Sequence, residues 1–175
     1  MEKIAEEAEL SVETVYGAFG SKAKLLARVI EVALVGDEVP VAVAERSWTL
    51  EVRAEMNQTR QLELLARNTR NILERAGPVQ WAAIMASDQE PEIEALVTRN
   101  QKTRLRIQTE FISWVAARGP FRDGLTVEEA GRRYWILAAV EVHHLLRRTM
   151  GWSALRYERW LAESLKAQLL PAKWG

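Results

Sequence analysis

Apolar residues recur every three or four positions along most of the chain, and no stretch alternates apolar and polar residues as a β-strand does. This pattern predicts an all-α protein. Capping and helix-breaking residues delimit longer helices over residues 21–36, 59–76, 91–118, 126–148 and 153–170, and shorter ones over residues 48–54 and 81–85. Gly77 and Pro78 are expected to end the helix over 59–76, because proline lacks the backbone N–H that continues a helix. Thr126 and Glu129 have the spacing of a capping box at the start of the helix over 126–148.

The amino-terminal residues predict two further short helices joined by a tight turn. Ile4 and Ala8 lie on one apolar face, and Ser11 is placed to cap the second helix through its side-chain oxygen. In that helix Val15 and Phe19 are one turn apart and are expected to pack inward against Ile4 and Ala8. The side chains left on other faces are those of Thr14, Tyr16 and Ala18. This is the layout of a helix-turn-helix, in which the second helix enters the DNA major groove.

The same stretch resembles the TetR family of bacterial transcriptional regulators. The residues that match its signature are Ile4, Ala5, Ala8, Ser11, Thr14, Tyr16, Phe19, Lys22, Leu25 and Leu26. Glu9 departs from it, since the family usually has a glycine there with a positive φ, and we expect a slightly altered turn. The family also places a helix before this motif. We therefore expect the head, residues 1–36, to be an incomplete helix-turn-helix.

The resemblance implies which head residues contact double-stranded operator DNA. Thr14, Tyr16 and Lys22 would bind phosphates, which sets the register of the protein on the duplex but not the sequence that it reads. The full predicted set is Ser11, Val12, Glu13, Thr14, Tyr16, Gly17, Ala18 and Lys22. Residues 1–35 hold four basic and six acidic side chains, a balance of −2. Binding would therefore depend on a few placed contacts and partly on DNA shape.

The larger unit, residues 37–175, is expected to be a multi-helix ligand-binding and dimerisation domain, as in the resembled family. Aromatic and thioether side chains at helical spacing suggest a chamber for a small lipophilic or aromatic effector. The predicted lining residues are Trp81, Met85, Ile107, Phe111, Trp114 and Trp135. The alternative is that these side chains simply fill the core. A strongly ionic effector would need a buried counter-charge, for which Glu141 and Arg104 are the candidates.

The last two helices predict a homodimer. Residues 134–146 are apolar on almost every face, and a helix of that kind must be covered on both sides. The final helix has an apolar face too wide for one seam, and in the resembled family these two helices pair with their mates in a four-helix bundle. The predicted interface residues are Val140, Glu141, His144, Tyr157, Trp160, Leu161 and Leu165.

Composition narrows the remaining possibilities. The 175 residues contain no cysteine, which excludes disulfides and thiolate metal sites. No apolar run is long enough to span a membrane and no signal peptide is recognisable, so a cytoplasmic protein is expected. His143 and His144 are adjacent and point about 100° apart on a helix, so they are not expected to chelate one metal. No phosphate loop, catalytic triad or metal-spaced set is found, and neither a catalytic residue nor a cofactor is predicted.

Two functional hypotheses follow. The first is a ligand-responsive transcriptional repressor that binds palindromic operator DNA as a homodimer. The second is a dimeric small-molecule-binding helical module whose DNA-binding head is incomplete and inactive. Binding of DNA by the chain would discriminate between them.

Overall fold

The computed structural model describes residues 1–36 and 45–172, which form helices and no strand. The all-α prediction is therefore confirmed for this part of the chain. The α-helices are α1 (Glu2–Glu7), α2 (Val12–Phe19), α3 (Lys22–Val35), α4 (Ser47–Ala54), α5 (Gln58–Ser87), α6 (Pro91–Ala116), α7 (Val127–Leu137), α8 (Val140–His144) and α9 (Ala154–Leu169). A 3-10 turn, η2 (Arg122–Gly124), precedes α7, and a π-helical turn, η3 (Leu145–Thr149), follows α8.

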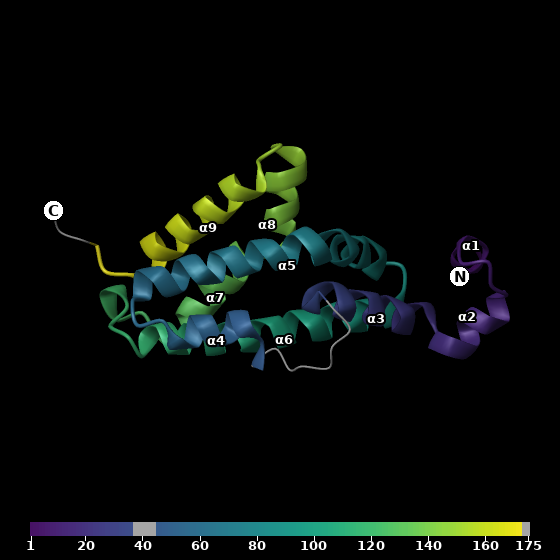
Figure 1. The fold of residues 1–175 in the computed structure, drawn as a ribbon, viewed down its shortest axis with the longest axis horizontal. Coiled ribbons are helices and arrows are strands. Elements are labelled where there is room, and N and C mark those ends of the chain that lie inside the picture. Colours follow the sequence, from purple (N-terminus) through teal and green to yellow (C-terminus); the bar gives the residue numbers. More distant parts are fainter. Residues whose placement is uncertain (37–44, 173–175) are drawn as a thin grey trace.

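Helix α5 is the centre of the molecule. It packs against α3, α4, α6, α8 and α9, and it runs beside α6 over most of the length of the body (Figure 1). Helices α1 and α2 project from one end, where α3 joins them to the body (Figure 1). None of the helices in the described residues is long and apolar enough to cross a membrane.

The buried side chains form two clusters. The larger joins α5, α6, α7 and α9, and its fully buried members include Leu62, Ile112, Tyr157 and Leu161. The smaller joins α3 to the adjoining ends of α5 and α6, and consists of Ile30, Ala83, Ile93 and Leu96. Burial of each large apolar side chain contributes roughly 1.5–3 kcal/mol. The smaller cluster therefore fixes the carboxyl-terminal half of α3 to α5 and α6.

The predicted helix starts are confirmed by their caps. The side-chain oxygens of Ser11, Ser21, Thr126 and Ser153 each accept the backbone N–H three residues ahead. The reciprocal half of the predicted capping box is absent, since the Glu129 carboxylate lies 3.5 Å from Arg132 instead. Glu9 adopts a φ of 55°, in the left-handed region that favours glycine.

The prediction that Gly77 and Pro78 end a helix is wrong. Helix α5 is 30 residues long and continues through both positions. Ala76 and Ala83, on either side of this point, are buried, and Gly77 lies under the His143 ring of α8. Packing on both flanks thus outweighs the local penalty for proline, whose own side is exposed.

The predicted single helix over 126–148 is also wrong. Helix α7 ends at Leu137, α8 begins at Val140, and η3 completes the segment. The break turns the two halves so that Tyr134, Val140 and Leu146 are all buried in the larger cluster. The apolar run that seemed to need a second subunit is therefore mostly covered within the protomer.

Candidate functional site

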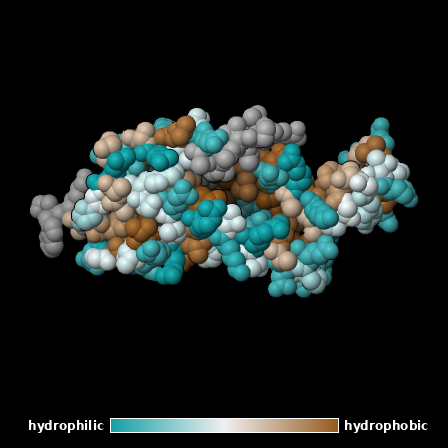
Figure 2. Space-filling view, turned by 90° about the horizontal axis from the view of Figure 1, so that it is seen from below, coloured by the Kyte–Doolittle hydropathy of each residue, from teal (hydrophilic) through white to brown (hydrophobic). Residues whose placement is uncertain are grey.

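A cavity of about 220 Å³ lies inside the helical body. Side chains from α3, α5, α6, the α7–α8 junction and the segment around α4 line it. The apolar part of the wall includes Leu65, Leu73, Ile84, Ile107, Phe111 and Val140. Figure 2, which views the molecule from below, shows hydrophobic side chains gathered around a hollow near the middle of this face. A partly open, largely apolar space of this kind is suited to a small organic molecule.

Two of the six predicted pocket residues, Ile107 and Phe111, line this cavity. Trp114 lies behind Phe111, with the ring centroids 5.2 Å apart, and is not part of the wall. Trp135 lies under the guanidinium of Arg104, 5.0 Å from its carbon to the ring centroid. Both tryptophans therefore support wall residues from outside the cavity.

Trp81 and Met85 lie away from the cavity because they belong to the continuous helix α5. Their neighbours Ala83 and Ile84 face the cavity, which turns Trp81 and Met85 to another side. Trp81 stacks on His144, with ring centroids 4.1 Å apart. Met85 is 61% exposed. The expectation of a separate short helix over residues 81–85, with Trp81 and Met85 lining the chamber, is thus corrected.

Eight uncharged polar side chains complete the cavity wall, and sequence reasoning missed them. They are Asn68, Thr69 and Gln80 of α5, Asn100, Gln101, Thr103 and Gln108 of α6, and Tyr134 of α7. Thr69 Oγ1 and the Tyr134 hydroxyl are 2.7 Å apart in a buried hydrogen bond. Burial raises the pKa of Tyr134 to about 12, although hydrogen bonds from Thr69 and Gln108 act to lower it.

Two of these polar side chains, Asn68 and Gln108, have unused hydrogen-bonding atoms. Asn68 and Gln108 are only 6% and 7% exposed. Among the described residues, Asn68 Nδ2 and Gln108 Oε1 have no hydrogen-bond partner. A signal for Asn68 was present in the sequence, since Leu65, Asn68 and Ile72 share one face at helical spacing, and a polar residue there must be buried.

The charged residues of the wall are Arg104 and Glu141, next to the helix break, and Arg46 across the cavity. Arg104 Nη1 donates to the backbone carbonyl of Ala138 at 2.8 Å and so satisfies the end of α7. Burial lowers the pKa of Arg104, while the negative charge of Glu141 acts to raise it. The two opposite charges therefore compensate one another on this side of the cavity.

The predicted DNA-contacting residues lie on the projecting helices. The Ser11 hydroxyl accepts the Thr14 N–H at 3.1 Å, which fixes the start of α2. Every predicted contact residue is exposed except Val12, which is partly buried. Gly17 has no atom within 4 Å of the position where a Cβ would stand, so its surface is open. Lys22 forms an ion pair with Glu90, the residue before α6.

The expected packing inside the head is formed only in part. Ala5 and Val15 are buried, but Ile4, Leu10 and Phe19 are 45%, 52% and 37% exposed. The prediction that Phe19 and Ile4 face inward is therefore wrong. The physical reason is size, because two helices of six and eight residues offer too little surface to cover these side chains.

The predicted interface residues are mostly occupied within the protomer. The side chains of Val140, Tyr157, Leu161 and Leu165 are buried, the last three completely. Trp160 is partly buried against Tyr157, His144 stacks on Trp81, and Glu141 is exposed. Helix α9 has already used its wide apolar face against α5 and α7. The exposed apolar side chains of this region are those of Ile136, Leu145, Met150 and Leu155.

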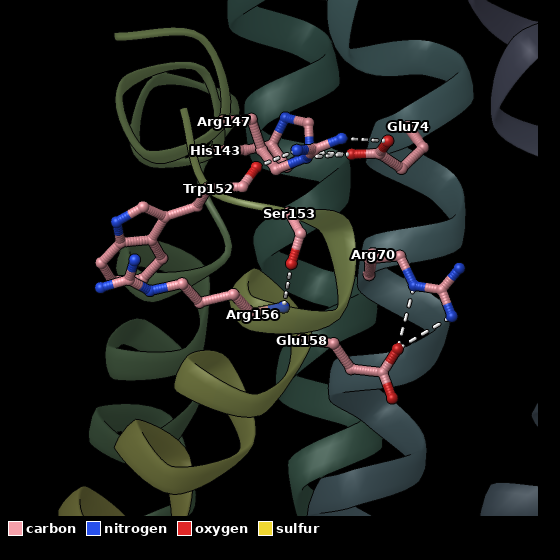
Figure 3. A network of polar contacts seen from close by, with 8 residues as sticks. All are labelled: Arg70, Glu74, His143, Arg147, Trp152, Ser153, Arg156 and Glu158. Carbon is pink, nitrogen blue, oxygen red and sulfur yellow. Dashed lines mark hydrogen bonds and ion pairs between the residues drawn. The ribbon is translucent and has the colours of Figure 1, made fainter. Parts of the chain in front are cut away.

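A polar network on the outside of α5 ties it to the carboxyl-terminal segments (Figure 3). Arg147 Nε and Nη2 donate to the two carboxylate oxygens of Glu74 at 2.7 and 2.8 Å, and His143 Nε2 lies 3.0 Å from the same carboxylate. The hydrogen bond from Arg147 lowers the pKa of Glu74 to about 2. Arg70 forms a second ion pair, at 2.8 Å, with Glu158 of α9.

Within residues 1–36 and 45–172, no group of three histidine or acidic side chains is arranged to hold a metal ion. No protein-family model, curated protein or solved structure matches the chain. Its function is therefore inferred from its own residues.

Proposed function

We propose that the protein is a ligand-responsive regulator that binds double-stranded operator DNA through α1 and α2, acts as a homodimer, and responds to a small, mainly apolar effector in the cavity. The resemblance of residues 4–26 to the TetR family suggests repression. In this proposal α2 is the recognition helix, with Tyr16 and Lys22 at the phosphates.

The observation that carries the proposal is the position of α3. Lys22 and the end of α2 lie at one end of this helix, while Ile30 and Leu34 near the other end line the cavity. Ile30 also belongs to the buried cluster that fixes α3 to α5 and α6. A molecule that moves these wall residues would therefore also move the helix on which α1 and α2 are carried, because a packed helix shifts as a unit.

One observation favours the second hypothesis, in which the head is inactive. The exposed apolar side chains Ile4, Leu10 and Phe19 leave the head with little packing of its own, and its charge balance is acidic. The competing function is therefore a ligand-binding helical module without DNA binding.

Selection from a pool of random-sequence DNA duplexes, followed by gel-shift titration, tests DNA binding. We expect enrichment of palindromes whose half-sites are about one helical turn apart. Lys22→Ala should weaken binding to all enriched duplexes alike, by about tenfold, because a charged phosphate contact is lost. Glu90→Gln should act in the opposite direction, since it releases Lys22 from its carboxylate partner.

Lys102→Ala is the matched control, because Lys102 is an exposed lysine on α6 outside the proposed DNA surface. It should leave the affinity unchanged. If no sequence is enriched, the DNA-binding proposal fails and the ligand-binding module remains. A change of base preference in Lys22→Ala, without loss of affinity, would show that Lys22 reads bases and not phosphates.

A further inference from the structure

We propose that the cavity ligand is a neutral, mainly apolar molecule carrying a carboxamide-like group, with an acceptor oxygen for Asn68 and a donor N–H for Gln108. The inference rests on the proposal that the cavity is a ligand site, and it adds the chemical class of the ligand. Asn68 of α5 and Gln108 of α6 belong to the wall of the same cavity.

The two unused atoms are costly to bury. A buried donor or acceptor without a partner destabilises a fold by about 1–3 kcal/mol, so such groups are rare unless something else satisfies them. Asn68 Nδ2 and Gln108 Oε1 are in this state among the described residues. One is a donor and the other an acceptor, so together they are complementary to a group that has both functions.

Thr69 and Tyr134, two further polar residues of the wall, share a 2.7 Å hydrogen bond. Tyr134 is also hydrogen-bonded by Gln108, whose Oε1 has no partner among the described residues. Deprotonation of Tyr134 is suppressed by burial, which raises its pKa to about 12, so no phenolate faces the ligand at neutral pH. The rest of the described wall holds the polar side chains of Gln80, Asn100, Gln101 and Thr103, none of which has a buried atom without a hydrogen-bond partner. It also holds apolar side chains, including Leu65, Ile107 and Phe111.

The charged side chains of the wall do not favour an ionic ligand. Arg104 and Glu141 line the same side of the cavity and carry opposite charges, so neither an anion nor a cation meets an unopposed counter-charge on that side. Arg46, the third charged residue of the wall, already has an interaction of its own. Arg104 is further engaged with the Ala138 carbonyl and the Trp135 ring. A ligand charge would have to be desolvated without full compensation, which is costly in an apolar cavity. A neutral polar group therefore fits this wall better than an ionic one.

Four matched probes test the inference by calorimetry and thermal shift on the full chain. They are phenylacetamide, its N,N-dimethyl derivative, phenylacetate and propylbenzene. Phenylacetamide is expected to bind most tightly, and the dimethyl derivative about tenfold more weakly, because it lacks the N–H for Gln108. Ile107→Trp, which fills the cavity, should abolish binding of all four.

Two variants assign the hydrogen bonds. Asn68→Leu should weaken phenylacetamide about tenfold and leave propylbenzene unchanged, and Gln108→Leu should remove the difference between phenylacetamide and its dimethyl derivative. Gln61→Leu is the matched control, because Gln61 is also a buried glutamine with an unpartnered Oε1 but lies outside the cavity. It should not alter any of the four affinities.

The outcomes separate this inference from the proposal on which it rests. If propylbenzene binds and phenylacetamide has no advantage, the cavity is a ligand site but the amide inference is overturned. If no probe binds, both are overturned. A readout without ligand is the melting temperature of Asn68→Leu, which should hold or rise because an unpartnered buried amide is removed. A marked fall would show that the amide has an internal partner, which also overturns the inference.

Discussion

The carboxylate of Glu74 joins segments about seventy residues apart in the sequence. It accepts two hydrogen bonds from Arg147 and lies 3.0 Å from His143 Nε2 (Figure 3). The charged form of Glu74 is favoured by Arg147, which holds its pKa at about 2, below the usual 4.5. For His143 burial outweighs the nearby carboxylate, so its pKa falls below the usual 6.5. The fold thus favours a charged Glu74 beside a neutral His143.

Acid should therefore destabilise the protein in two successive pH ranges. Both groups bind fewer protons folded than unfolded, so the free energy of unfolding decreases as the pH falls. The contribution of His143 is lost below pH 6.5, and that of Glu74 is lost between pH 4.5 and about 2. Chemical denaturation at a series of pH values measures both decreases.

Glu74→Gln should remove the lower of these two ranges while the upper one stays. The matched control is Glu31→Gln, since Glu31 forms an exposed ion pair with Arg28 on a single helix, a type of pair that contributes little. A pH profile of Glu74→Gln that coincides with that of the unmodified protein would contradict the assignment.

At the level of whole elements, α5 shows how packing overrides a local signal. Proline inside a helix costs about 3 kcal/mol relative to alanine, because it lacks the N–H and crowds the carbonyl four residues earlier. Pro78 is exposed, so its side chain offers little packing in return. Pro78→Ala is therefore expected to raise the free energy of unfolding, by about 1–3 kcal/mol after relaxation of the helix.

Gly77→Ala provides the contrast for Pro78→Ala. Its gain in helix propensity, about 1 kcal/mol, should be offset because the new Cβ would stand 3.3 Å from His143 Nδ1. Denaturant titration of the two variants makes the comparison. If Pro78→Ala destabilises the protein, the proline has a role in shaping α5 that its exposure does not indicate.

The same elements show which structural features a local sequence pattern can predict. Helix starts were predictable because a cap such as Ser11 or Ser153 is a local interaction between a side chain and a backbone N–H three residues away. The continuation of α5 through Pro78 was not, because it depends on α8 packing over Gly77 from far along the chain. Of the predicted pocket residues, Ile107 and Phe111 do line the cavity.

Its polar wall was not predicted. Asn68 and Gln108 come together only through the pairing of α5 with α6, which no local pattern specifies. The tryptophans were expected at the cavity from their helical spacing and from the resemblance, and neither determines which side of a helix faces a hollow. Burial of Tyr157 and Leu165 within the protomer likewise depends on the break between α7 and α8.

At the scale of the whole molecule, one exposed apolar surface is the candidate interface of the proposed dimer. Leu145 of η3, Met150 directly after it and Leu155 in the first turn of α9 are each more than half exposed. Leu145→Glu combined with Leu155→Glu should convert a dimer into a monomer, because each places a charge in an apolar interface. Light scattering at micromolar concentration measures the mass of each form.

Met56→Glu is the control for this surface. Met56 is 69% exposed, but it lies just before the amino-terminal end of α5 and outside η3 and α9. It should leave the mass unchanged. A monomer in the unmodified protein would contradict the dimer, and a dimer that survives both substitutions would contradict this surface.

The narrow attachment of α1 and α2 has a consequence for how the molecule opens. These helices pack on each other and, through α2, on α3, and their buried residues Ala5 and Val15 belong to neither core cluster. Their backbone amides should exchange with solvent hydrogen through local opening, while those of α5 and α6 exchange only when the whole body unfolds. The molecule is thus a cooperative body with a separately melting tip.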